Sequence, residues 1–197
     1  MRHIPFIGIP FLWTILAMPA GATTIDFEGF SDSTILTNQY PTVLFSNAII
    51  LTSGISLNEL DFPPHSGVNV ASDNGGFLSM AFSGPITSFS GYFTYAAPLT
   101  LMAFDNANTQ VASAASLFSA NYASSGTGTP NELISLSFLG GIFKVTIEGD
   151  PGGSSFTIDD LSYASKTATT PEPATLPLIL GGLAALLALK GRGCRIT

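Results

Sequence analysis

Four carboxylates near the two ends of the central sequence are the residues best suited to chemistry. Asp26 and Glu28 lie two positions apart, and Asp159 and Asp160 are adjacent. Residues two apart on a strand point to the same side, and calcium takes six to eight oxygen ligands. If the first and last strands are neighbours, these four residues predict a structural calcium site. The alternative is that they are solvated edge and turn residues that prevent pairing with other chains.

Asp160 is a conspicuous member of this group. Strict alternation along the expected last strand places it on the same side as Phe156 and Ile158. An unpaired charge among apolar side chains is costly. The pattern therefore predicts either a bound ion or a β-bulge at this position.

His65 is the only histidine beyond the N-terminal segment, and it stands in Pro-Pro-His-Ser-Gly, a loop by composition. No Gly-x-Ser-x-Gly motif is present, and one histidine argues against a zinc site. We therefore expect a non-catalytic domain with an exposed His65. The alternative is an exported enzyme that acts on polysaccharide. Two close carboxylates, or His65 aligned with a serine and an aspartate, would favour that alternative.

Aromatic residues gather in the middle of the sequence, where Phe89, Tyr92, Phe93 and Tyr95 fall within a short stretch. Buried aromatics dominate the interiors of β-sandwiches. We expect these four side chains to belong to the core. An exposed pair of Tyr92 and Tyr95 would instead support contact with a glycan.

Apolar and polar residues alternate through much of residues 23–164, which predicts strands with one buried face. The predicted strands are 24–28, 43–46, 49–52, 78–82, 87–95, 99–104, 110–112, 134–138, 143–147 and 156–161. Turn residues separate them, including Gly140-Gly141 between two of the later strands. The spacing predicts an all-β domain, an antiparallel β-sandwich or jelly roll, over residues 23–164.

The charge of the central sequence restricts its partners. All thirteen acidic residues lie between Asp26 and Glu172, where Lys144 and Lys166 are the only basic residues, so the formal charge there is −11. Such a domain cannot neutralise phosphates, which excludes nucleic acid, but it attracts divalent cations. The single cysteine, Cys194, forms no intramolecular disulfide, so the domain relies on its core or on a bound ion.

The N-terminus has the three parts of a secretory signal. Arg2 precedes an apolar run over residues 4–18, and Ala20-Gly21-Ala22 is a small-x-small cleavage site. We expect a signal peptide over residues 1–22, recognised by Sec-type export machinery and cut by signal peptidase after Ala22. An uncleaved anchor helix is the alternative, which three prolines in the segment disfavour.

The C-terminus combines a rigid motif, an apolar segment and a basic tail. After a polar linker (165–170), Pro171-Glu172-Pro173 is held extended by its prolines. Residues 174–189 are apolar and predict a single transmembrane helix. Its length would be roughly 24 Å, which is short of the roughly 30 Å thickness of a hydrocarbon core. Basic residues stay cytoplasmic, which places the domain outside. Those of the tail (190–197) are Lys190, Arg192 and Arg195.

This C-terminal order resembles the PEP-CTERM sorting signal, here over residues 171–197. The resemblance implies cleavage near Pro171-Glu172-Pro173 by an exosortase-like transpeptidase in a bacterium that makes exopolysaccharide. It also implies transient anchoring in the inner membrane, followed by display at the cell surface or in the extracellular matrix. An ordinary membrane-tethered structural domain is the alternative.

Three stretches of the central sequence look like the jelly-roll domains common in PEP-CTERM proteins. They are IDFEGF (25–30), LTNQYPTVLFSNA (36–48) and FTIDDLSY (156–163). Those domains are distantly similar to carbohydrate-binding modules, many of which hold a structural calcium. The resemblance implies a non-catalytic domain that binds extracellular polysaccharide or serves structurally. No sugar-binding residue of those modules maps onto this sequence.

Overall fold

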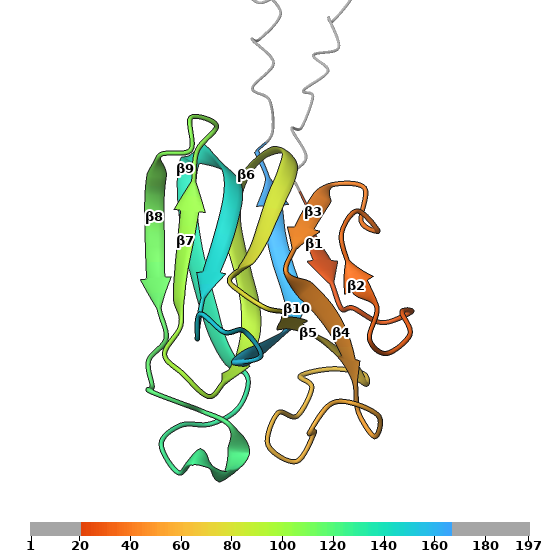
Figure 1. Cartoon of the computed structure of the whole chain (residues 1–197). Coiled ribbons are helices and arrows are strands. Elements are labelled where there is room, and N and C mark those ends of the chain that lie inside the picture. The colour runs from red at the N-terminus through yellow and green to blue at the C-terminus, as the bar shows by residue number, and fades with distance from the viewer. Residues whose placement is uncertain (1–20, 167–197) are drawn as a thin grey trace, which may run out of the picture. The chain divides into compact units, whose positions relative to one another are not determined.

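Antiparallel β-strands make up the fold in the computed structural model, which describes residues 21–166 (Figure 1). The strands are β1 (Ala22–Ile25), β2 (Ile35–Leu36), β3 (Val43–Ser46), β4 (Ala48–Thr52), β5 (Asn69–Asp73), β6 (Leu78–Tyr95), β7 (Thr100–Phe104), β8 (Gln110–Ala115), β9 (Glu132–Glu148) and β10 (Phe156–Ser165). The only helical element among the described residues is a 3₁₀ turn, η1 (Ala123–Ser125). The predicted all-β antiparallel class is confirmed.

Two long strands, β6 and β9, differ most from the sequence-based prediction. The predicted strands 78–82 and 87–95 merge into β6, and 134–138 and 143–147 merge into β9. The turn predicted at Gly140-Gly141 is therefore wrong. Gly141 has a φ of 111°, a backbone conformation that glycine adopts at little cost. The pairing register between β6 and β9 shifts next to it. The glycines bend β9 without reversing the chain.

The paired strands β6 and β9 form a ribbon that joins two groups of strands. At one end, β6 pairs with β3 while β9 pairs with β7, which pairs with β8. Beyond the bend, β6 pairs with β10, and β5, β4 and β2 follow in the sheet. Strand β1 pairs with the C-terminal part of β10. The whole forms one hydrogen-bonded path, β2-β4-β5-β10-β6-β9-β7-β8.

Strand β5 was not predicted because its residues do not alternate. All of Asn69–Asp73 is buried, polar residues included. The strand lies between β4 and β10, and its outer side is covered by the connection from β4 to β5 (residues 53–68), which we call the covering loop. A strand covered on both sides loses the period-two signal.

The core is built from aromatic residues of both strand groups. Phe45 of β3 meets Phe27, which follows β1, at 6.3 Å between ring centroids. Phe82 of β6 meets Tyr163 of β10 at 5.2 Å. Such contacts contribute beyond the area that they bury, and they draw the two groups onto one interior.

The predicted core role is confirmed for most of the aromatic run in β6. Phe89, Phe93 and Tyr95 are buried, whereas Tyr92 is only partly buried. The exposed pair of Tyr92 and Tyr95 that would have supported glycan contact is therefore not formed.

Most of the two predicted processing segments lies outside the described residues. Ala20 and the sorting signal are among these, including Pro171, Glu172, Pro173 and the basic residues Lys190, Arg192 and Arg195. Ala22 is the first residue of β1. Within residues 21–166, no helix is long and apolar enough to cross a membrane.

Replacing a buried aromatic should be far more costly than trimming an exposed leucine. Phe93 is fully buried, and its ring packs 6.2 Å from that of Phe156. We expect Phe93→Ala to lower the free energy of unfolding by about 3–5 kcal/mol. Leu139→Ala, at a site that is 81% exposed, should change it by less than about 0.5 kcal/mol. Denaturant unfolding of both variants measures the difference, and equal losses would contradict this core.

Candidate functional site

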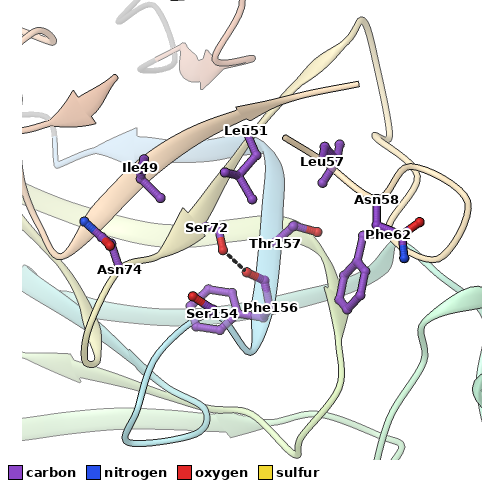
Figure 2. A pocket seen from close by; sticks show the side chains of 10 residues that line it. All are labelled: Ile49, Leu51, Leu57, Asn58, Phe62, Ser72, Asn74, Ser154, Phe156 and Thr157. Atoms are coloured by element: carbon purple, nitrogen blue, oxygen red, sulfur yellow. Dashed lines mark hydrogen bonds between the residues drawn. The ribbon is translucent and has the colours of Figure 1, made fainter. Parts of the chain in front are cut away.

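A pocket of about 280 Å³ opens on the outer side of β4, β5 and β10 (Figure 2). Its lining residues come from these strands, from the covering loop, from the turn after β5 and from the turn before β10. They are Ile49, Leu51, Leu57, Asn58, Phe62, Ser72, Asn74, Ser154, Phe156 and Thr157.

Strand register builds the floor of this pocket. Ile49, Ser72 and Thr157 are directly opposite one another on β4, β5 and β10. Opposed residues of antiparallel strands project on the same side, so these three side chains form one row. The Ser72 hydroxyl donates to the Phe156 carbonyl at 2.8 Å, which fixes the middle of the row.

The buried carboxylate of Asp73 holds the turn that forms one end of the pocket. It accepts hydrogen bonds from the Ser155 and Phe156 amides at 2.8 and 3.2 Å, and from the Ser155 hydroxyl at 2.9 Å. The Asp73 carbonyl also accepts from the Ser154 amide at 3.0 Å. Ser154 is thereby placed beside Asn74 at the pocket (Figure 2).

The covering loop supplies the opposite wall through Leu57, Asn58 and Phe62. The Phe62 ring stacks on Tyr122 at 5.9 Å between centroids. The neighbouring Asp61 accepts from the Ser124 amide at 3.1 Å. The wall is thus braced from outside by the segment around η1.

No charged residue lines the pocket. Apolar surface comes from Ile49, Leu51 and Phe62. Amide groups come from Asn58 and Asn74, at opposite ends of the pocket, and hydroxyls come from serine and threonine (Figure 2). Asparagine and hydroxyl side chains both donate and accept hydrogen bonds. The arrangement suits an uncharged ligand with an apolar face and several hydroxyl groups.

The sequence offered no specific signal for these residues. Asn58, Asn74, Ser154 and Thr157 are polar residues of turns and of a strand, a type that recurs throughout residues 23–164. Of the lining residues, only Phe62, an aromatic residue in a polar loop, could have suggested a binding site from the sequence.

The predicted carboxylate residues lie on neighbouring strands or next to them. Strand β1 pairs with β10, so the expectation that the first and last strands are adjacent is confirmed. However, β1 ends at Ile25, and Phe27 has a φ of 59°. Asp26 and Glu28 are therefore not on a strand, and the argument that they share one side of it is wrong.

Asp159 and Asp160 both contact the covering loop. The Asp159 carboxylate, which is 1% exposed, accepts from the His65 and Ser66 amides, each at 2.8 Å. The Asp160 carboxylate lies 2.6 Å from His65 Nδ1 and accepts from the Ser66 hydroxyl at 3.0 Å. We call Asp159, Asp160 and His65 the anchor cluster.

A β-bulge explains the position of Asp160. Its φ is 44°, and the register of β10 against β6 shifts between Asp159 and Ser162. The bulge inserts an extra residue and turns the Asp160 side chain towards the loop. Of the two predicted explanations for this charge, the bulge is the one observed.

Glu28 contacts the end of the covering loop. Its carboxylate accepts from the Val68 and Asn69 amides, each at 2.8 Å. Asp26 accepts from the Glu28 amide at 3.2 Å. Within residues 21–166, no three acidic, histidine or cysteine side chains form a metal-ligand group. The calcium site remains a prediction.

His65 is exposed, as predicted, but its ring is held on two sides. It stacks on Tyr92 with centroids 3.4 Å apart, and it bonds Asp160 through Nδ1. The Ser66 hydroxyl bonds the same carboxylate rather than the imidazole. A catalytic triad requires the serine on the imidazole, so these contacts do not have that order.

No protein-family model matches this chain, and no curated protein matches it significantly. Neither comparison supplies a function, so the activity has to follow from the chemistry of the site.

Asp159 should make the stability of the domain depend on pH. Burial raises the pKa of Asp159 to about 6, against the opposing effect of its backbone hydrogen bonds. Because this pKa is above the value of an unfolded aspartate, the folded state takes up the proton more readily. The free energy of unfolding should therefore rise by up to about 3 kcal/mol as pH falls from about 6 to about 4. Asp159→Asn should remove that part of the profile.

Denaturant unfolding between pH 4 and pH 7 measures this effect as the difference between the wild type and the variant. Asp150→Asn, in an exposed turn, is the control and should keep the wild-type profile. If the Asp159→Asn profile parallels that of the wild type, the raised pKa of Asp159 is wrong.

Calcium binding should raise the melting temperature, because a ligand that binds only the folded state stabilises it. We expect a rise of several degrees in millimolar calcium relative to chelator, which Asp26→Asn with Glu28→Gln abolishes. Thermal melts of both proteins test this. If the wild-type protein melts at the same temperature in calcium and in chelator, the calcium prediction for the four carboxylates is wrong.

Proposed function

We propose that this chain is an exported bacterial envelope or extracellular-matrix protein whose β-domain binds uncharged carbohydrate in the pocket. The observation that carries this proposal is the lining, which combines aliphatic and aromatic surface with neutral amides and hydroxyls. Small-molecule sites are typically apolar with a few placed polar groups.

The lining complements the two kinds of surface on a sugar ring. The C–H face of a pyranose packs against apolar side chains, here Ile49, Leu51 and Phe62. Its hydroxyls both donate and accept, as do the amides of Asn58 and Asn74. The two residues stand at opposite ends of the pocket (Figure 2), and the Asn58 side-chain nitrogen also donates to the Asp61 carboxylate at 3.1 Å. A ring bound between them would have one amide at each end.

Charge favours a neutral glycan over an acidic one. The described residues contain only two basic side chains, Lys144 and Lys166. Lys144 is engaged by Asn108 at 2.5 Å and by the Phe104 ring at 4.3 Å from its centroid. The acidic domain repels polyanions, so uronic-acid polymers are disfavoured.

The predicted β-sandwich of jelly-roll type remains part of this proposal. In it, the two strand groups joined by the β6–β9 ribbon pack face to face. Its support is the contact of Phe27 with Phe45 and of Phe82 with Tyr163. The pocket would then lie on the outer side of one sheet.

Export and sorting complete the proposal. Sec-type machinery and signal peptidase would release the N-terminus, and an exosortase-like transpeptidase would process the sorting signal. The described strands overlap the expected junctions by one residue each: β1 begins at Ala22, the last residue of the expected signal peptide, and β10 ends at Ser165, the first residue of the expected linker. A membrane-tethered structural domain is the competing role.

Removing both amides should abolish most of the carbohydrate binding. We expect Asn58→Ala with Asn74→Ala to weaken binding of neutral oligosaccharides at least tenfold, since each lost hydrogen bond to a ligand costs about 1 kcal/mol or more. An array of neutral and acidic glycans, followed by calorimetry on the best neutral one, gives the measurement. Asn106→Ala, in an exposed turn, should bind like the wild type. A wild-type protein that binds no neutral glycan overturns the carbohydrate proposal and favours the structural role.

Sorting is tested separately in a host that makes exopolysaccharide. Replacing Pro171-Glu172-Pro173 with three alanines should leave the C-terminal segment attached, because the extended motif that enters a protease groove is lost. Intact-mass spectrometry of the exported protein shows the retained segment. Alanines at Thr167, Thr169 and Thr170 form the matched control and should be processed normally. A processed mass unchanged by the motif substitution rejects the sorting signal.

A further inference from the structure

We infer that the anchor cluster positions the covering loop as the wall of the pocket, and that it thereby sets ligand affinity without touching the ligand. The consequence for affinity rests on the proposed carbohydrate site, whereas the consequence for the loop does not. Under this inference, Asp159, Asp160 and His65 are positioning residues.

The covering loop has few backbone contacts with the sheet that it covers. Most of its backbone hydrogen bonds are local, such as Leu57 amide to Thr52 carbonyl at 3.2 Å and Phe62 amide to Asn58 carbonyl at 2.8 Å, and one long-range bond runs to the η1 segment, from the Ala123 amide to the Asp61 carbonyl at 2.9 Å. One backbone bond, from the Ser53 amide to the Val68 carbonyl at 2.9 Å, closes its base. Its position over the sheet therefore depends on side-chain contacts.

The buried Asp159 makes the strongest of these contacts. Its carboxylate takes the consecutive amides of His65 and Ser66, each at 2.8 Å, and so fixes the backbone there in position and direction. Hydrogen bonds to a carboxylate are roughly twice as strong as neutral ones. Removing them would leave two amides unpaired against the sheet.

The His65 ring adds contacts with two strands. It bonds Asp160 on β10 and stacks on Tyr92 of β6. These two strands are neighbours. The His65 ring therefore contacts β10 and β6 at once, whereas the amide hydrogen bonds of His65 and Ser66 reach only β10.

Two prolines link the anchor cluster to the pocket wall. Pro63 and Pro64 stand between His65 and Phe62, and each proline fixes its own φ and restricts the preceding residue. The Pro63 carbonyl also accepts from the Asn131 side-chain amide at 3.1 Å. Because this link is stiff, the position of His65 determines that of Phe62, which lines the pocket.

The far end of the loop is fixed by a different carboxylate. Gly67 has a φ of 55°, and any side chain there would collide with Glu28. Glu28 holds the amides that follow, those of Val68 and Asn69. The loop is thus fixed after the anchor cluster by Glu28. The wall residues before the cluster contact the η1 segment on one side, through Asp61 and Phe62, and are joined to the cluster on the other through the two prolines.

Hydrogen exchange of the full-length chain tests the inference without any ligand. We expect Asp159→Asn and Asp160→Asn each to speed exchange of the Leu57, Asp61 and Phe62 amides at least tenfold. The matched control is Val145→Ala, a cavity in buried β9 that lowers stability and leaves these amides at the wild-type rate. His65→Phe, which keeps the stack on Tyr92 and loses the bond to Asp160, should give an intermediate effect.

The outcomes separate the two proposals. If exchange rises only at the His65 and Ser66 amides, the cluster does not position the wall and the inference is overturned. Should Asp159→Asn fail to fold, the Asp160→Asn variant alone decides this point. If the wall amides exchange faster, calorimetry with the best neutral oligosaccharide should show at least tenfold weaker binding in both variants and unchanged binding in Val145→Ala. Faster exchange in a protein that binds no neutral glycan supports the positioning role and rejects only the carbohydrate function.

Discussion

Antiparallel pairing of β6 with β9 is the constraint on which the other strands depend. Each long strand bends: the outer edge of β6 pairs with β3 and, beyond the bend, with β10, while the outer edge of β9 pairs with β7. A strand pair that changes partners along its length carries two groups of strands without a break in hydrogen bonding. The bend relies on Gly141, whose positive φ is accessible to glycine at little cost. The shared aromatic interior follows from this geometry.

A second constraint follows on the outer side of β5 and β10, where polar groups are buried under a loop. Asp159 is buried there, and burial of charge is expensive unless hydrogen bonds replace water. Here they do: among the described residues, no buried polar side-chain atom lacks a partner. Two of the three amides that bond the Asp159 carboxylate belong to the covering loop, and the third is that of Asp160. The burial of this charge on β10 therefore requires the loop to be in place.

This arrangement gives the pocket its character. The carboxylates of Asp73 and Asp159 accept from backbone amides, and no charged residue lines the pocket. An acidic domain with a neutral pocket is consistent with the proposed binding of an uncharged polysaccharide, since its charge repels polyanions. Burial raises the pKa of Asp159 because it disfavours the ionised form, and the hydrogen bonds from the Ser66, Asp160 and His65 amides only partly oppose this shift.

The amino-acid sequence by itself determined the all-β class and most strands, because the period-two pattern records burial of one face, as along β3 and β9. It also indicated the irregularity at Asp160 through a charge placed on an apolar side. Only the tertiary structure decided that Gly140-Gly141 bends a strand rather than ending it, since that depends on the partner strand β6. It alone assembled the pocket and the anchor cluster, because Asn58, Asn74 and Thr157 meet through strand register and loop contacts that leave no local trace in the sequence.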